Sequence, residues 1–104
     1  MAYFRGSTTP LAKEAVWTSQ VGMRERHDSL SGTISADKGG TLYIEQSSDG
    51  VNWDVSTSYE ITANDGKGFI EQLVAPYWRL RYVNGSEAQG TFRVSVTTQA
   101  GGDS

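Results

Sequence analysis

The stretch that most constrains the fold runs from Gly39 to Asp54, with the sequence GGTLYIEQSSDGVNWD. Apolar and polar side chains alternate along its first half, and the turn-forming residues Ser-Ser-Asp-Gly follow at 47–50. A period of two is typical of a strand with one buried face, so this order predicts a β-hairpin. Asp49 suits a turn in which a side chain caps backbone amides, and Gly50 can adopt the positive φ that closes it.

A four-residue loop sets a register for this hairpin. It pairs Gln46 with Val51 and sets Ile44 opposite Trp53. The apolar side chains of both strands then share one face. The pattern therefore predicts that Trp53 belongs to the core.

The composition sets limits on the kind of protein. A chain of 104 residues forms one domain, and its three Trp, five Tyr and three Phe can bury a large area. The absence of Cys excludes a disulfide framework, a thiolate nucleophile and a cysteine metal site. The net charge of -3 does not suggest a nucleic-acid partner. Without a run of about 18 apolar residues or a signal-peptide core, we expect a soluble intracellular product with no membrane partner.

Further short strands are predicted along the rest of the chain. They cover residues 15–20, 30–36, 58–63, 69–74, 77–83 and 91–97. In 69–74 the buried pair is either Phe69 with Leu73 or Ile70 with Val74. With the hairpin this makes seven or eight strands and no helix of ten residues, which predicts an all-β antiparallel β-sandwich.

Two sandwich topologies remain open, jelly-roll and immunoglobulin-like. A tight turn at Asn84-Gly85 would set Leu80 opposite Gln89 and so mix the faces of the last two strands. We therefore expect a longer loop, a bulge, or two strands in different sheets. Consecutive strands that do not form hairpins favour the jelly roll.

The chain divides into three segments. Residues 1–10 are expected to be a flexible or subunit-bridging N-terminal arm, because Tyr3, Phe4 and Arg5 are residue types enriched at interfaces. Residues 11–98 form the β-sandwich domain. Residues 99–104, QAGGDS, are expected to be a disordered tail.

No catalytic site is predicted. His27 is the one histidine and lies beside Asp28, in the charged stretch VGMRERHD, which is expected to be a loop or an exposed edge strand. Adjacent strand residues point to opposite faces, so these two side chains do not converge on one substrate. A solvated loop histidine is the favoured interpretation, and we expect a protein that is not an enzyme.

The oxygen-rich run DGVNWD could bind a hard cation such as calcium through Asp49, Asn52 and Asp54. It lacks the spacing of an EF-hand loop and its distant glutamate. Turn capping by Asp49 and an outward Asp54 explain the run better. We therefore predict no metal site and no cofactor.

An outward row of Arg79, Arg81 and Arg93, with Tyr77 beside it, is the candidate partner-binding surface. If the last two strands were neighbours, Arg93 would face another arginine, which is unfavourable unless a carboxylate such as Glu45 or Glu71 lies between them. A charge ladder on a solvated sheet is favoured over a protein or glycan contact surface.

The runs GTLYIEQSSDGVNWD, APYWRLRYVNG and QGTFRV carry a family resemblance. Across about residues 11–96, the chain resembles small β-sandwich structural proteins of tailed bacteriophages and prophages. The resemblance implies a virion protein made in the bacterial host cytoplasm, either a capsid decoration protein or a tail or fibre accessory protein. It implies the major capsid protein or another virion protein as partner, and homo-oligomerisation. No functional residue is carried over, because the shared motifs are hairpin and core residues.

A carbohydrate-binding module is the rival interpretation, because a β-sandwich with many aromatic residues can present a platform for sugar rings. The burial of Trp17, Trp53 and Trp78 distinguishes the two. Alternation predicts that Trp53 and Trp78 point inward, which counts against a platform. An enzyme is the third and most remote interpretation.

Overall fold

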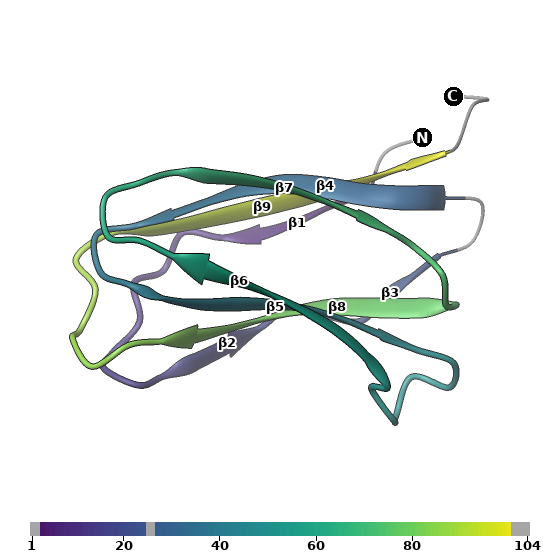
Figure 1. Cartoon of the computed structure of the whole chain (residues 1–104), viewed down its shortest axis with the longest axis horizontal. Helices are drawn as coiled ribbons and strands as arrows, with labels where there is room; N and C mark the ends of the chain where they lie inside the picture. Colours follow the sequence, from purple (N-terminus) through teal and green to yellow (C-terminus); the bar gives the residue numbers. More distant parts are fainter. Residues whose placement is uncertain (1–2, 25–26, 101–104) are drawn as a thin grey trace.

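The computed structural model describes residues 3–24 and 27–100. Within these residues the chain forms nine strands and no helix, and so no helix that could cross a membrane. The strands are β1 Tyr3–Ser7, β2 Val16–Thr18, β3 Gly22–Met23, β4 His27–Ala36, β5 Gly40–Ser47, β6 Val55–Ile61, β7 Lys67–Gln72, β8 Tyr77–Asn84 and β9 Phe92–Ala100. They make two antiparallel sheets packed face to face (Figure 1), so the predicted all-β sandwich is confirmed.

The strand order is that of a jelly roll. Sheet A has the order β1-β9-β4-β7, and sheet B has the order β2-β8-β5-β6, with β3 also paired to β8. Apart from the β5–β6 hairpin and the step from β2 to β3, each connection crosses from one sheet to the other. An immunoglobulin-like sandwich would keep more consecutive strands side by side. The last two strands therefore lie in different sheets, one of the arrangements expected from their patterns.

The core fills the space between the sheets and follows the predicted alternation. Its buried members are Leu30, Ile34, Ala36, Leu42, Ile44, Ile61, Phe69, Leu73, Trp78, Leu80, Tyr82, Phe92, Val94 and Val96. The open choice in β7 is resolved in favour of Phe69 and Leu73, whereas Ile70 and Val74 are exposed.

The hairpin is confirmed, but its predicted register is wrong by four residues. Gln46 pairs with Val55 in place of Val51, and Ile44 pairs with Thr57 in place of Trp53. The turn signal at 47–50 is real, but β6 starts only at Val55, because residues 48–54 all belong to the loop. Trp53 is therefore not part of the core.

The sandwich extends beyond the expected limits of 11–98 at both ends. Residues 3–7 of the expected arm form β1, which pairs antiparallel with β9 of the same chain. At the other end, residues 99–100 of the expected tail belong to β9. The sequence did not predict β1, because this strand forms only by pairing with β9, some 90 positions away. Residues 1–2 and 101–104 lie outside the described structure.

Close approach of neighbouring strands within each sheet requires glycine at two positions. A Cβ on Gly22 would lie 2.3 Å from Cε2 of Trp78, so glycine leaves room for the buried indole ring. A Cβ on Gly32 would lie 2.1 Å from the carbonyl oxygen of Ser95 on the neighbouring strand β9, so only glycine fits there.

Candidate functional site

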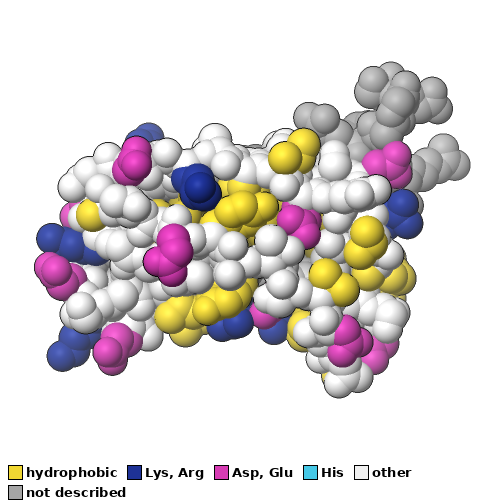
Figure 2. Space-filling model, in the orientation of Figure 1, with side chains coloured by type: hydrophobic (Ala, Val, Ile, Leu, Met, Phe, Trp, Pro, Cys, Tyr) yellow, Lys and Arg dark blue, Asp and Glu magenta, His cyan; other side chains and the backbone are white. Residues whose placement is uncertain are grey.

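The solvent-facing side of sheet B carries arginine, glutamate, tyrosine and methionine side chains that lie outside the hydrophobic core. Strand register places Met23 beside Tyr77 and Glu45 beside Arg79 on this side, and Arg81 beside both Thr18 and Tyr43. We call this side the sheet B outer face. In the side view of Figure 2, apolar, basic and acidic side chains lie next to one another along the lower edge, where sheet B lies in Figure 1.

Glu45 connects the two arginines of this face. Its Oε1 accepts a hydrogen bond from Nε of Arg79 at 2.8 Å, and its Oε2 accepts from Nη2 of Arg81 at 3.1 Å and from Nε at 3.2 Å. The Glu45 side chain is only 8% exposed. Burial alone would raise the pKa of Glu45, but the hydrogen bonds and charges of Arg81 and Arg79 outweigh it and hold the pKa below its ordinary value. Glu45 was named in the sequence analysis only as a carboxylate that could separate Arg93 from another arginine, whereas here it joins Arg79 to Arg81 within one sheet.

Two aromatic rings also contact the guanidinium groups. The guanidinium carbon of Arg79 lies 4.3 Å from the ring centroid of Trp53, and that of Arg81 lies 4.3 Å from the ring centroid of Tyr43. Both contacts are cation–π pairs. Together Trp53, Arg79, Glu45, Arg81 and Tyr43 form what we call the aromatic–arginine row. One face of each ring is covered by a guanidinium.

The loop 48–54 is held in a fixed shape beside this row. Oδ1 of Asp49 accepts hydrogen bonds from the backbone amides of Val51 and Asn52, each at 2.8 Å, and from Oγ of Ser47 at 2.9 Å. The Asn52 amide and side chain, the Val51 amide and the Ser47 hydroxyl lower the pKa of the Asp49 carboxyl far below its usual range. Gly50 has a φ of 79°, the left-handed value expected there.

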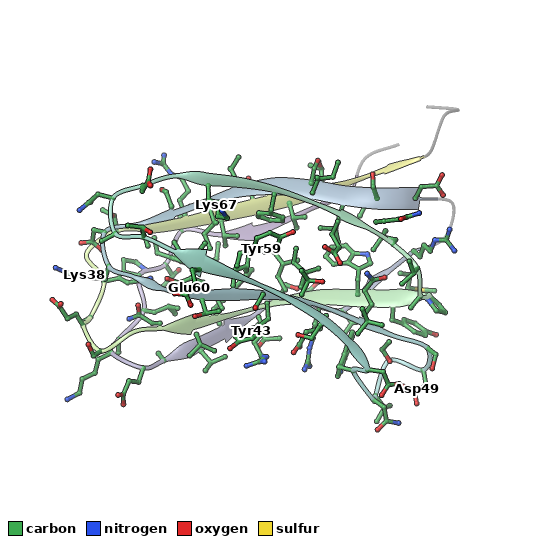
Figure 3. All side chains as sticks on the ribbon, viewed as in Figure 1. Lys38, Tyr43, Asp49, Tyr59, Glu60 and Lys67 are labelled. Atoms are coloured by element: carbon green, nitrogen blue, oxygen red, sulfur yellow. The ribbon has the colours of Figure 1, made fainter. Side chains whose placement is uncertain are left out.

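These contacts show how the Asp49 carboxylate of the calcium candidate is used in this structure. The Asp49 carboxylate caps the turn, as the sequence predicted. Within residues 3–24 and 27–100 no three His, Cys, Asp or Glu side chains come together as metal ligands would. Figure 3 shows Asp49 near the tip of a loop that projects past the sheet, and Tyr43 on the same side. The loop therefore borders the sheet B outer face.

Exposed apolar side chains surround the aromatic–arginine row. Met23 is 54% exposed, and Val16, at the other end of the same sheet edge, is 52% exposed. Val51, in the 48–54 loop, is 75% exposed. The sheet B outer face thus combines aromatic, arginine and apolar groups.

The outer face of sheet A differs from that of sheet B. Arg93 lies on β9 in this sheet, opposite Ser35, so the predicted row of three arginines is wrong. It was wrong because strand pairing, which depends on contacts distant in sequence, places β8 and β9 in different layers. The neighbouring positions carry small hydroxyl side chains, Ser31, Thr33, Ser95 and Thr97.

Some predicted positions lie outside what the structure describes. Tyr3, Phe4 and Arg5 lie on β1 opposite Thr98, Thr97 and Val96, but their side chains are not among the described parts. The same is true of the His27 side chain. Its neighbour Asp28 forms an ion pair with Arg24 at 3.5 Å.

The three tryptophans lie in three different environments. Trp78 is fully buried, as predicted, and Trp17 is half-buried, with its ring 6.2 Å from that of Phe92. Trp53 stacks on Arg79 outside the core, so the prediction of an inward Trp53 is wrong. The prediction applied the two-residue alternation of a strand to Trp53, which lies in the 48–54 loop, where side chains do not alternate between two faces.

Sequence reasoning also missed the site roles of Tyr43, Glu45 and Met23. Alternation had already placed Tyr43 and Glu45 on the outward side of β5. A glutamate on one strand and two arginines two residues apart on another were the signal available. What was missing was the knowledge that β5 pairs with β8.

A family model matches nearly the whole chain. It is described as "Uncharacterised protein YqxG N-terminal domain" and matches residues 2–99. The "Uncharacterized protein YqxG" of Bacillus subtilis (strain 168) is 34% identical over 73 residues, which are 69% of this chain and 25% of YqxG. The chain thus spans a quarter of the length of this curated relative.

Solved structures with the same fold have different descriptions. The "PBSX exported protein XepA" has a TM-score of 0.89 and 24% identity, over 100% of this chain and 38% of that chain. A structure described as "CBM4 structure and function" has a TM-score of 0.53 and 17% identity, over 90% of this chain and 71% of that chain. Likeness at these identities establishes the β-sandwich fold, which by itself does not determine a function.

Proposed function

Because this chain belongs to the family of the YqxG N-terminal domain, whose description names no activity, we propose its function from its surface: it is a non-catalytic binding domain of a bacteriophage structural protein. It docks on another virion protein through the sheet B outer face. The observation that carries the proposal is the aromatic–arginine row. Its arginines are held by ion pairs with Glu45 and by aromatic rings, yet they remain partly exposed to solvent.

The make-up of this face matches that of protein interfaces. Aromatic residues, Met and Arg are enriched at interfaces, whereas Lys, Glu and Asp are depleted. Between Met23 and Tyr43 the sheet B outer face carries three of the enriched types, Met, Arg and Tyr, with Trp53 added from the loop. Its central acid, Glu45, is already paired with arginine. Interfaces concentrate their binding energy in a few Trp, Tyr and Arg side chains, which are the residues of this row.

Capsid decoration is the role we propose first. The phage resemblance of the sequence supports it, with the major capsid protein as partner and the virion as location. A domain that binds only the assembled shell stabilises the shell by mass action, because its binding free energy is lost when the shell comes apart. Copies placed at symmetry axes of the shell would act as a homo-oligomer.

Glycan binding is the second candidate, as a carbohydrate-binding module or a tail or fibre accessory protein. It is favoured by one observation, the position of Trp53 outside the core. Sugar rings stack on an open aromatic face, but here one face of Trp53 and one face of Tyr43 are covered by guanidinium groups. The preference for a protein partner rests instead on the Met, Arg and Tyr side chains that share the sheet B outer face.

The test is cosedimentation of the purified protein with undecorated, expanded heads of the phage that encodes it, alongside a glycan array. Saturable binding at a fixed ratio per capsomer is the expected result. Glycan binding without head binding would overturn decoration and support the second candidate. Binding to neither would overturn both.

A further inference from the structure

The charges in the aromatic–arginine row do not balance. Arg79 and Arg81 carry two positive charges, and both form their ion pairs with the single carboxylate of Glu45. Among the described residues no second carboxylate pairs with either arginine. One positive charge is therefore left at the centre of the row, although the chain as a whole has a net charge of -3.

The two guanidinium groups also keep unused hydrogen-bond donors. A guanidinium has five N–H donors in a fixed planar fork. In the described structure Arg79 donates only through Nε, and Arg81 only through Nε and Nη2, in each case to Glu45. Both Nη groups of Arg79 and Nη1 of Arg81 remain available. The two side chains are 26% and 32% exposed, so these donors can be reached.

The donors are held in place before any partner arrives. Each guanidinium contacts both the Glu45 carboxylate and an aromatic ring, which restricts its side-chain rotation. The hydrogen bonds of Asp49 fix the loop that carries Trp53. Side chains already ordered in the free protein lose less entropy on binding.

We infer that Arg79 and Arg81 form a clamp for a carboxylate, supplied by an acidic side chain of the docked protein. A second carboxylate would neutralise the remaining charge and would accept from the free Nη groups, as arginine forks do with carboxylates. This inference rests on the proposed docking function and specifies the chemistry of the partner at the centre of the face.

The test uses a synthetic peptide of alternating Glu and Gly, titrated into ¹⁵N-labelled protein and followed by NMR. The neutral comparison is the matching peptide of Gln and Gly. We expect the Nε–H signals of Arg79 and Arg81 to move with the acidic peptide alone, while that of Arg93, on the other sheet, stays in place. Equal shifts with both peptides, or no shift at either arginine, would overturn the clamp.

Two substitutions with opposite expected effects sharpen the test. Arg79→Gln removes a donor and a charge, and should weaken binding of the acidic peptide about tenfold. Glu45→Gln leaves two uncompensated arginines and should strengthen it. If Glu45 and Arg79 had only a structural role, both variants would act in the same direction, and that result would contradict the clamp. Arg93→Gln is the matched control and should leave binding unchanged.

Failure of the clamp can be told apart from failure of the docking function. If heads are bound and Arg79→Gln binds them as well as wild type does, the docking function stands and the clamp is wrong. If heads are not bound but the acidic peptide is, the clamp stands and the partner is another acidic protein. Alginate, a polymer of uronic acids, is the third probe, and its binding in place of the peptide would overturn a protein source of the carboxylate.

Discussion

The guanidinium carbon of Arg79 lies 4.3 Å from the centroid of the Trp53 ring, and this contact ties the 48–54 loop to the first half of strand β8. The loop is closed from within by Asp49 and is anchored to the sheet by the indole ring. The loop is therefore fixed both by its own hydrogen bonds and by its contact with the sheet. A surface loop that is already ordered can contribute to a binding face without losing further conformational entropy when the partner binds.

The Trp53–Arg79 contact should be measurable as a coupling energy. In a double-mutant cycle with Trp53→Ala and Arg79→Ala, we expect a coupling of about 0.5–1 kcal/mol in the free energy of unfolding, the range for a partly exposed cation–π pair. Urea denaturation provides the measurement. The cycle of Trp53→Ala with Arg81→Ala is the control and should be close to additive, because Arg81 stacks on Tyr43. Equal coupling in both cycles would show that the pairing is not specific.

Acid should weaken the fold in part through Glu45. Its pKa is lowered in the folded protein, so its contribution to stability is fully present above the ordinary value of 4.5 and is lost as the pH falls through the lower folded value. Asp49 and Asp37 have lowered pKa values and contribute with the same sign. Urea midpoints of wild type should therefore fall more steeply than those of Glu45→Gln between about pH 6 and pH 3. Parallel curves would mean that the arginines do not stabilise the Glu45 carboxylate.

Gly32→Ala should destabilise the protein by about 3 kcal/mol, because the new methyl group would meet the carbonyl oxygen of Ser95, a backbone atom that cannot turn aside. Gly68→Ala, on the neighbouring strand β7, is the matched control. Its Cβ would lie 3.9 Å from the carbonyl oxygen of Gly32, an ordinary contact, so its stability should be unchanged or slightly higher. Equal thermal midpoints for the two variants would contradict the close approach of β4 and β9.

Deleting residues 1–7 should lower the thermal midpoint and promote aggregation. The deletion removes β1 and leaves the backbone of β9 unpaired along one side of sheet A. Thermal melting followed by light scattering measures both effects. An unchanged midpoint would instead restore the interpretation of these residues as an arm separate from the domain.

Local patterns predicted the inner faces of the strands well. The alternation of Trp78, Leu80 and Tyr82 in β8 matched their burial, because burial on one face of a strand imposes a period of two. The jelly-roll option also followed from strands that could not be paired with their neighbours. These features depend on residues close together in the sequence.

The register and the site could not be predicted in the same way. Asp49 gave a correct turn signal, but nothing in the sequence showed that the chain continues outward through Trp53 before β6 begins. The meeting of Glu45 with Arg79 requires β5 and β8 to be neighbours, which is decided by how the whole core packs. The assignment of Arg93 to the same row failed for the same reason.

The most direct test of the docking face compares two lysine substitutions in binding to phage heads. Met23→Lys and Ile70→Lys each add a charge at an exposed apolar residue, 54% and 68% exposed, but on opposite sheets. Neither should change the fold much, because both side chains point into solvent. We predict that Met23→Lys weakens cosedimentation with undecorated heads at least about tenfold while Ile70→Lys binds as wild type. Loss of binding in Ile70→Lys with full binding in Met23→Lys would contradict the account and move the interface to sheet A.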